Sequence, residues 1–207
     1  GIFVELARLG AAIDEGETVG IPHKTSKSKH APKLKTTTVV DKFAAAAIRL
    51  LIFTGCRLGE ILNLRWSEVD LERGLLFLPD SKTGRKTVVL AGPAIAILDD
   101  MPRGGTYVIA GETAGEQDEK PRADLNRPWR AIRRRAGLED VRIHDLRHSF
   151  ASVGAGAGLG LPIIGKLLGH AQASTTQRYA HLDADPVRRA ADVIAGRIDA
   201  ALSGNRK

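Results

Sequence analysis

The chain has 207 residues, of which 43% are hydrophobic and only 4% aromatic, so it can bury one large or two small cores built mainly from aliphatic side chains. Lys and Arg outnumber Asp and Glu by 31 to 24, and the net charge of +7 suits a polyanionic partner. The lone Cys56 excludes an internal disulfide and a four-cysteine zinc site, and no apolar run reaches the roughly 20 residues that span a bilayer.

The first third of the chain reads as helices separated by a basic loop. Apolar residues at helical spacing predict a helix over 2–13. Residues 20–38 lose this periodicity and are rich in Lys, Ser, Thr and Pro, so we expect a flexible basic loop that either solubilises the chain or contacts nucleic acid. Residues 41–53 are Ala-rich and apolar, which predicts a buried helix with Asp41 as its N-cap, and 57–64 predict a second, short helix.

The middle of the chain carries the strand signals. Residues 74–78 and 87–90 are β-rich runs, and Ser81-Lys82-Thr83-Gly84 between them is typical of a hairpin turn. A third short strand is expected over 107–110.

From residue 124 onward the pattern is helical. An apolar stripe predicts the first of these helices, and it consists of Leu125, Trp129, Ile132 and Ala136. Further helices are expected near 145–154, 161–168, 172–180 and 186–202. In the last of them Asp185 is the expected N-cap and Pro186 the first helical residue. The fold class is therefore mixed α+β, mainly α-helical, with a small antiparallel sheet in a single domain over 1–207.

Two motifs resemble cofactor sites but lack the residues that those sites need. Residues 160–166 nearly match a phosphate-binding loop, yet Leu167 stands where the Mg²⁺-binding hydroxyl would be. The pair His144 and His148 has the spacing of a zinc-protease helix, but Asp145 replaces the Glu and Arg147 brings a cation beside the metal position. We expect neither a metal nor another cofactor.

Phosphodiester cleavage without a metal requires three kinds of group. A nucleophile must attack phosphorus, fixed cations must stabilise charge on the non-bridging oxygens, and a proton must reach the leaving 5′ oxygen. Arginine suits the second task because its planar fork matches phosphate oxygens. Two arginines, a lysine, two histidines and a tyrosine would suffice.

The sequence holds such a set in ordered motifs that resemble those of the tyrosine recombinases, the phage integrase family. The motifs are Thr54-Gly55-Cys56-Arg57-Leu58-Gly59-Glu60, Ser81-Lys82-Thr83-Gly84, His144-Asp145-Leu146-Arg147-His148, Leu168-Gly169-His170 and Thr175-Thr176-Gln177-Arg178-Tyr179. The resemblance covers residues 41–183. It implies the catalytic-domain fold of DNA breaking-rejoining enzymes and metal-free cleavage and rejoining of DNA through a 3′-phosphotyrosyl intermediate.

The resemblance assigns the phosphate-binding roles as follows. Arg57 and Arg147 would clamp the scissile phosphate, and His170 would hold a non-bridging oxygen. Glu60 matches the acidic position after the first arginine, and we expect it to orient His144 or Arg57 rather than take part in the chemistry.

The nucleophile and the proton carriers follow from the same motifs. Tyr179 would attack phosphorus, and His144 would accept the phenolic proton, because tyrosine has an ordinary pKa near 10. Lys82 would protonate the leaving 5′ oxygen, although the adjacent Arg85 and Lys86 leave the register of the hairpin lysine open.

The expected partners are double-stranded DNA and other recombinase protomers, assembled as a tetramer on DNA. The face formed by Arg127, Arg130 and Arg134 would contact DNA phosphates. The apolar stripe of the helix over 186–202 either docks on a neighbouring protomer or folds onto its own domain. Met101 is the only methionine, so we expect a fragment or processed chain, and nothing in it resembles the family's N-terminal core-binding domain. A DNA substrate implies a cytoplasmic enzyme of bacterial or phage origin, not a membrane protein.

Two other functions fit parts of the pattern. A type IB topoisomerase would use the same chemistry to relax DNA without exchanging partners. An inert DNA-binding relative would keep the fold, but such a protein would be expected to lose the tyrosine or an arginine.

Overall fold

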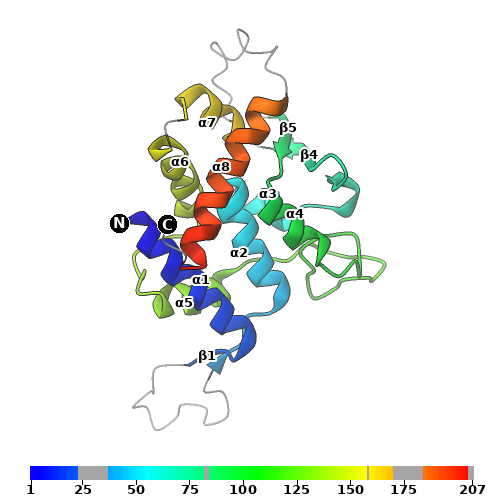
Figure 1. Ribbon diagram of the computed structural model, residues 1–207. Helices are drawn as coiled ribbons and strands as arrows, with labels where there is room; N and C mark the ends of the chain where they lie inside the picture. The colour runs from blue at the N-terminus through cyan, green and yellow to red at the C-terminus, as the bar shows by residue number, and fades with distance from the viewer. Residues whose placement is uncertain (23–36, 82–83, 158, 170–183, 205–207) are drawn as a thin grey trace.

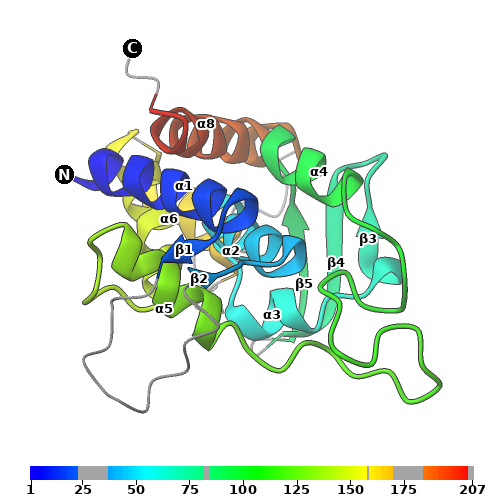
Figure 2. The same cartoon turned by 90° about the horizontal axis from the view of Figure 1, so that it is seen from below.

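Helix α2 (Lys42–Thr54) lies at the centre of the domain (Figures 1 and 2). The computed structural model describes residues 1–22, 37–81, 84–157, 159–169 and 184–204. Every residue of α2 from Ala44 onward except Arg49 is buried, as expected of a helix that is apolar on nearly all sides. The backbone N–H of Ala44 donates to the Asp41 carboxylate at 2.9 Å, which confirms the predicted N-cap, and Gly55 ends the helix with a left-handed φ of 63°.

Four helices surround α2, and the first and last described helices pack side by side. Helices α1 (Ile2–Thr18), α4 (Gly92–Asp99), α6 (Asp145–Gly156) and α8 (Ala184–Leu202) contact it or one another (Figure 2). The approach of α1 to α8 is so close that a Cβ on Gly10 would lie 2.8 Å from the Cβ of Leu202.

The apolar stripe of α8 is buried within its own domain. Its most enclosed members are Val187, Ala190, Ala191, Ile194 and Ile198. Of the two predicted uses of this stripe, packing on its own domain is therefore the one observed. The helix begins at Ala184, one residue before the expected cap, so Asp185 and Pro186 belong to its first turn.

A three-stranded antiparallel sheet lies at one end of the domain. Strand β4 (Leu75–Ser81) pairs with β5 (Gly84–Val89) and with β3 (Val69–Asp70), in the order β3-β4-β5. The predicted hairpin is confirmed, but the third strand expected over 107–110 is wrong. Tyr107 makes only an isolated bridge to Arg65, whereas β3 follows directly from the preceding short helix η1 (Trp66–Glu68) and occupies the free edge of β4.

The remaining elements complete the helical part of the domain. They are α3 (Leu58–Leu62), α5 (Asn126–Arg135), α7 (Leu161–Leu168) and the two-residue strands β1 (Ile21–Pro22) and β2 (Thr37–Thr38). The flexible loop expected over 20–38 does not include its two ends, because Ile21 pairs with Thr38 and both are buried, and residues 23–36 lie outside the described residues. The helix predicted near 172–180 lies outside the described residues. None of the described helices combines the length and apolarity needed to cross a membrane.

Candidate active site

Arg57 is held at the start of α3 by Glu60. The carboxylate of Glu60 accepts the backbone N–H of Arg57 at 2.8 Å through Oε2, and it accepts the Arg57 guanidinium at 2.8 Å through Oε1. Because both the backbone and the side chain of Arg57 bind one acid, the direction of the guanidinium is fixed from two points. Of the two residues that we expected Glu60 to orient, His144 and Arg57, these contacts are with Arg57.

Arg147, the second arginine expected to bind the phosphate, lies on α6 and is buried. Only 6% of the residue is exposed, and its guanidinium donates to the carbonyl of Gly55 and, at 2.7 Å, to that of Leu168. It therefore joins the end of α2 to the end of α7. Both acceptors are neutral, so these contacts orient the positive charge without cancelling it.

The two guanidinium groups lie close enough to repel each other. Burial is the main cause that lowers the pKa of Arg147, and repulsion from Arg57 lowers it further, while Glu60 compensates in part. An arginine stays protonated at neutral pH despite such a shift. A pair of oriented and mutually repelling cations favours a bound anion, which is what a clamp for a phosphate requires.

Lys86 is a site residue whose position the sequence reasoning missed. Its ammonium lies 3.0 Å from Oε2 of Glu60, and the two side chains are 4% and 5% exposed. Burial alone would raise the pKa of the Glu60 carboxyl, but the backbone N–H of Arg57 and the charge of Lys86 outweigh it and hold that pKa below its usual range. A signal was present, since Lys86 shares the two-residue period of the buried Val88 and Leu90.

His144 lies immediately before α6, one helical turn from Arg147, as its spacing predicted. Its carbonyl accepts the backbone N–H of Arg147 at 3.2 Å, and the histidine itself is exposed. Its ring packs edge-on against His148, with 5.6 Å between the ring centroids. Asp145 accepts the backbone N–H of Arg142 at 2.8 Å and pairs with its guanidinium at 3.0 Å, which stabilises this end of the helix.

Three of the predicted site residues lie outside the described part of the chain, namely Lys82, His170 and Tyr179. The described residues next to two of them are Ser81, Gly84 and Gly169. Ser81 and Gly84 are paired at the end of the hairpin, and Gly169 ends α7 beside the carbonyl that Arg147 binds.

A cleft of about 930 Å³ opens beside Arg57 and Glu60. Arg65 and Tyr107 line it as well, and the phenol oxygen of Tyr107 accepts from Arg65 at 3.4 Å. Tyr107 is half-buried, and the Arg65 guanidinium lies over its ring, 5.3 Å from the ring centroid.

The arginine face predicted on α5 is exposed. Arg127, Arg130 and Arg134 all point away from the core, whereas Trp129 and Ile132 on the opposite side are buried. The helix therefore presents a row of positive charge on a rigid support.

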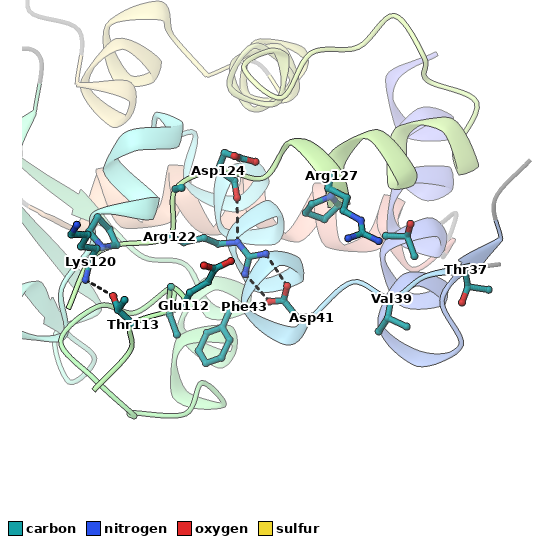
Figure 3. Close-up of a pocket in the computed structure, with 16 residues that line it drawn as sticks. Thr37, Val39, Asp41, Phe43, Glu112, Thr113, Lys120, Arg122, Asp124 and Arg127 are labelled. Atoms are coloured by element: carbon teal, nitrogen blue, oxygen red, sulfur yellow. Dashed lines mark hydrogen bonds and ion pairs between the residues drawn. The ribbon is translucent and has the colours of Figure 1, made fainter. Parts of the chain in front are cut away.

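A larger cavity, of about 1080 Å³, lies at the other end of α2 (Figure 3). Arg122 lines this cavity. Its guanidinium makes two hydrogen bonds to the carboxylate of Asp41, at 2.8 and 2.9 Å, and one to the carbonyl of Asp124. Asp41 neutralises the charge of Arg122, and Lys120 and Arg127 also line this cavity. Among the described residues no cluster of His, Cys, Asp or Glu has the geometry of a metal site.

The sequence and the fold both match known proteins. Residues 27–185 match the sequence model of the Phage integrase family. The chain is 30% identical over 178 residues to the tyrosine recombinase XerA of Pyrococcus furiosus, which covers 82% of this chain and 61% of the relative. It is 29% identical over 149 residues to the integrase of Salmonella phage P22, covering 66% of this chain and 38% of that protein. The XerH site-specific recombinase, crystallised with its difH substrate before cleavage, shares the fold with a TM-score of 0.58 at 23% identity, over 86% of this chain and 48% of XerH. The chain thus spans less than two thirds of the length of each of these proteins.

Proposed function

Since this chain belongs to the phage integrase family and is a tyrosine recombinase catalytic domain, we propose that it cuts and rejoins double-stranded DNA through a covalent bond between Tyr179 and a 3′ phosphate. The observation that carries the proposal is the pair Arg57 and Arg147, oriented by different partners and still positively charged. Such a pair stabilises the charge that develops on the non-bridging oxygens during attack.

In the proposed reaction the phenol oxygen of Tyr179 forms a bond to phosphorus while the bond from phosphorus to the 5′ oxygen breaks. His144 takes the phenolic proton, Lys82 gives a proton to the 5′ oxygen, and His170 binds a non-bridging oxygen. The phosphotyrosine link conserves the energy of the phosphodiester, so a 5′ hydroxyl can reverse the step without ATP. The exposed position of His144 one turn from Arg147 supports its role.

The proposed partners are DNA and further copies of the recombinase. The exposed face of Arg127, Arg130 and Arg134 supports phosphate contacts, and the XerH site-specific recombinase, which shares the fold, was crystallised bound to its difH substrate. Assembly as a tetramer on DNA remains part of the proposal. Because the apolar stripe of α8 is used within the domain, a contact between protomers through this helix would use its outer face. We propose a cytoplasmic reaction in a protein of bacterial or phage origin.

The test is a covalent adduct trapped on DNA. The chain is incubated in EDTA with a pool of end-labelled duplexes of random sequence that carry a nick, so that the strand beyond the nick diffuses away after cleavage and religation fails. We expect a labelled protein band that survives denaturation and disappears in Tyr179→Phe. The matched control is Tyr107→Phe, which removes the only other phenol and should still form the adduct.

An adduct that persists in Tyr179→Phe would show another nucleophile, and an adduct that requires Mg²⁺ would contradict the metal-free mechanism. No adduct in the unmodified chain would favour the inert DNA-binding relative.

A further inference from the structure

Lys86 is a buried charge to which the proposed chemistry gives no task. Its side chain is 4% exposed, and its ammonium lies 3.0 Å from the Glu60 carboxylate, which is itself 5% exposed. A buried ion pair contributes little net stability compared with a well-packed apolar pair, because both charges lose their hydration. The effect of this pair therefore has to be sought in what it holds in place.

What the pair holds is Arg57. Oε2 of Glu60 binds Lys86 and also the backbone N–H of Arg57, while Oε1 binds the Arg57 guanidinium. The position of this carboxylate therefore determines where the Arg57 guanidinium lies. The third contact, from the ammonium of Lys86 on β5, holds the carboxylate from the side of the sheet.

The stem of Lys86 also reaches the other half of the site. A Cβ on Gly169 would lie 2.7 Å from Cδ and 2.8 Å from Cε of Lys86, so any larger residue there would displace the lysine stem. Gly169 follows Leu168, whose carbonyl binds Arg147. Lys86 is thus packed between the residues that orient Arg57 and those that orient Arg147, on the strand that follows the hairpin turn.

We propose that Lys86 is a positioning residue of the active site, which fixes the Arg57 guanidinium through Glu60 and keeps it in register with Arg147. This role of Lys86 rests on the proposed function only in the experiments that measure DNA cleavage. Lys86 does not touch the reacting atoms, because its ammonium is enclosed with Glu60. It therefore differs from Lys82, to which proton transfer is assigned.

The central test is Lys86→Met, which keeps the packing of the stem and removes the charge. The matched control is Arg73→Met, a loss of one exposed positive charge at the opposite end of the same sheet. With the nicked random pool at saturating concentration, we expect adduct formation in Lys86→Met to slow by about 10–100-fold, as when an outer partner of a site residue is removed. Binding of the same pool should change little, and Arg73→Met should match the unmodified chain in both assays.

A second measurement needs no DNA. The order parameter of the Arg57 Nε–H bond, obtained from ¹⁵N relaxation, should fall in Lys86→Met and stay unchanged in Arg73→Met. A rigid Arg57 in Lys86→Met would overturn the proposal even if the unmodified chain formed no adduct. Failure of the proposed function and failure of this inference are therefore distinguishable.

Two further variants separate positioning from other roles. If Lys86 acts through Glu60, adding Lys86→Met to Glu60→Gln should slow the adduct no further, whereas additive losses would overturn the proposal. Should Lys86→Met fail to fold, Lys86→Met combined with Glu60→Met replaces the ion pair by apolar groups and restores the packing. A full cleavage rate in that double variant would also overturn it.

A bridging sulfur in place of the 5′ oxygen tests for acid catalysis, because a thiolate leaves without a proton. Such DNA should not rescue Lys86→Met. Rescue would make Lys86 the general acid and would overturn its assignment as a positioning residue.

Discussion

Two sets of arginines in this domain differ in how they are held. Arg57 and Arg147 have fixed partners: Arg57 is paired with Glu60, which also binds Lys86, and Arg147 is almost fully enclosed and binds two backbone carbonyls. The arginines on the outer face of α5 (Arg127, Arg130 and Arg134) are exposed and share only their helix. The contrast indicates two different tasks. Stabilising a transition state requires charges that are already oriented, whereas holding a DNA backbone requires only that charges be present.

The largest effect is expected from Arg147→Ala. Removing one oriented donor to the developing charge should slow adduct formation by about 10²–10³-fold. The carbonyls of Gly55 and Leu168 would also lose their partner, so the free energy of unfolding should fall by about 1–3 kcal/mol for each buried unsatisfied group. Adduct kinetics and thermal unfolding measure the two losses.

Arg57→Ala provides the comparison. Because the Arg57 side chain is 24% exposed, this substitution should lower activity with a smaller loss of stability than Arg147→Ala. Equal cleavage by Arg147→Ala and the unmodified chain would remove the distinction between the two sets of arginines.

A smaller effect, on affinity alone, is expected when Arg127, Arg130 and Arg134 are all changed to Gln. Each phosphate contact contributes about 0.9 to the slope of log affinity against log salt, so the slope should fall by about 3 in magnitude. The maximal cleavage rate at saturating DNA should be retained. Fluorescence anisotropy at several salt concentrations measures the slope.

Arg135→Gln is the matched control on the same helix. Because Arg135 already pairs with Glu15 at 2.6 Å, its substitution should leave the slope near its original value. A slope that does not change in the triple variant would place the DNA on another surface.

The smallest effect concerns pH, and Glu60→Gln isolates the part of it that comes from the buried Glu60. The pKa of Glu60 is lowered in the folded protein, so its contribution to stability is present above the unfolded-state pKa of about 4.3 and is lost as pH falls through the folded pKa. Thermal unfolding temperatures should therefore fall more steeply below about pH 4.3 in the unmodified chain than in Glu60→Gln. The triple α5 variant should follow the unmodified chain, because arginines do not titrate there. Parallel curves for the unmodified chain and Glu60→Gln would contradict the assigned shift.

The features that the sequence predicted are those that depend on neighbouring residues. Asp41 caps α2 through an amide three residues away, and the hairpin follows from two strands and a short turn. Glu60 reaches Arg57 within a single turn of helix. Each of these contacts is local; the cap and the hairpin follow from composition and spacing, whereas the expectation for Glu60 came from the family resemblance and left His144 and Arg57 as alternatives.

The features that the sequence did not predict depend on segments far apart in the chain. Lys86 lies on the same face of β5 as the buried Val88. Its contact with Glu60 depends on how β5 packs against α3, which the sequence alone does not show. The edge of β4 could have paired with β3 or with the segment that begins at Tyr107. It pairs with β3, and Tyr107 contacts Arg65 instead. Propensity cannot choose between such alternatives, because tertiary packing decides them.

The contact between α1 and α8 has a consequence for biosynthesis. Of the described helices, α1 leaves the ribosome first and α8 last, yet Gly10 and Leu202 form one tight crossing. Contacts this distant in sequence form late and slow the folding of a domain. The nascent chain would thus complete the core of this domain only after the segment that bears Tyr179 has been translated.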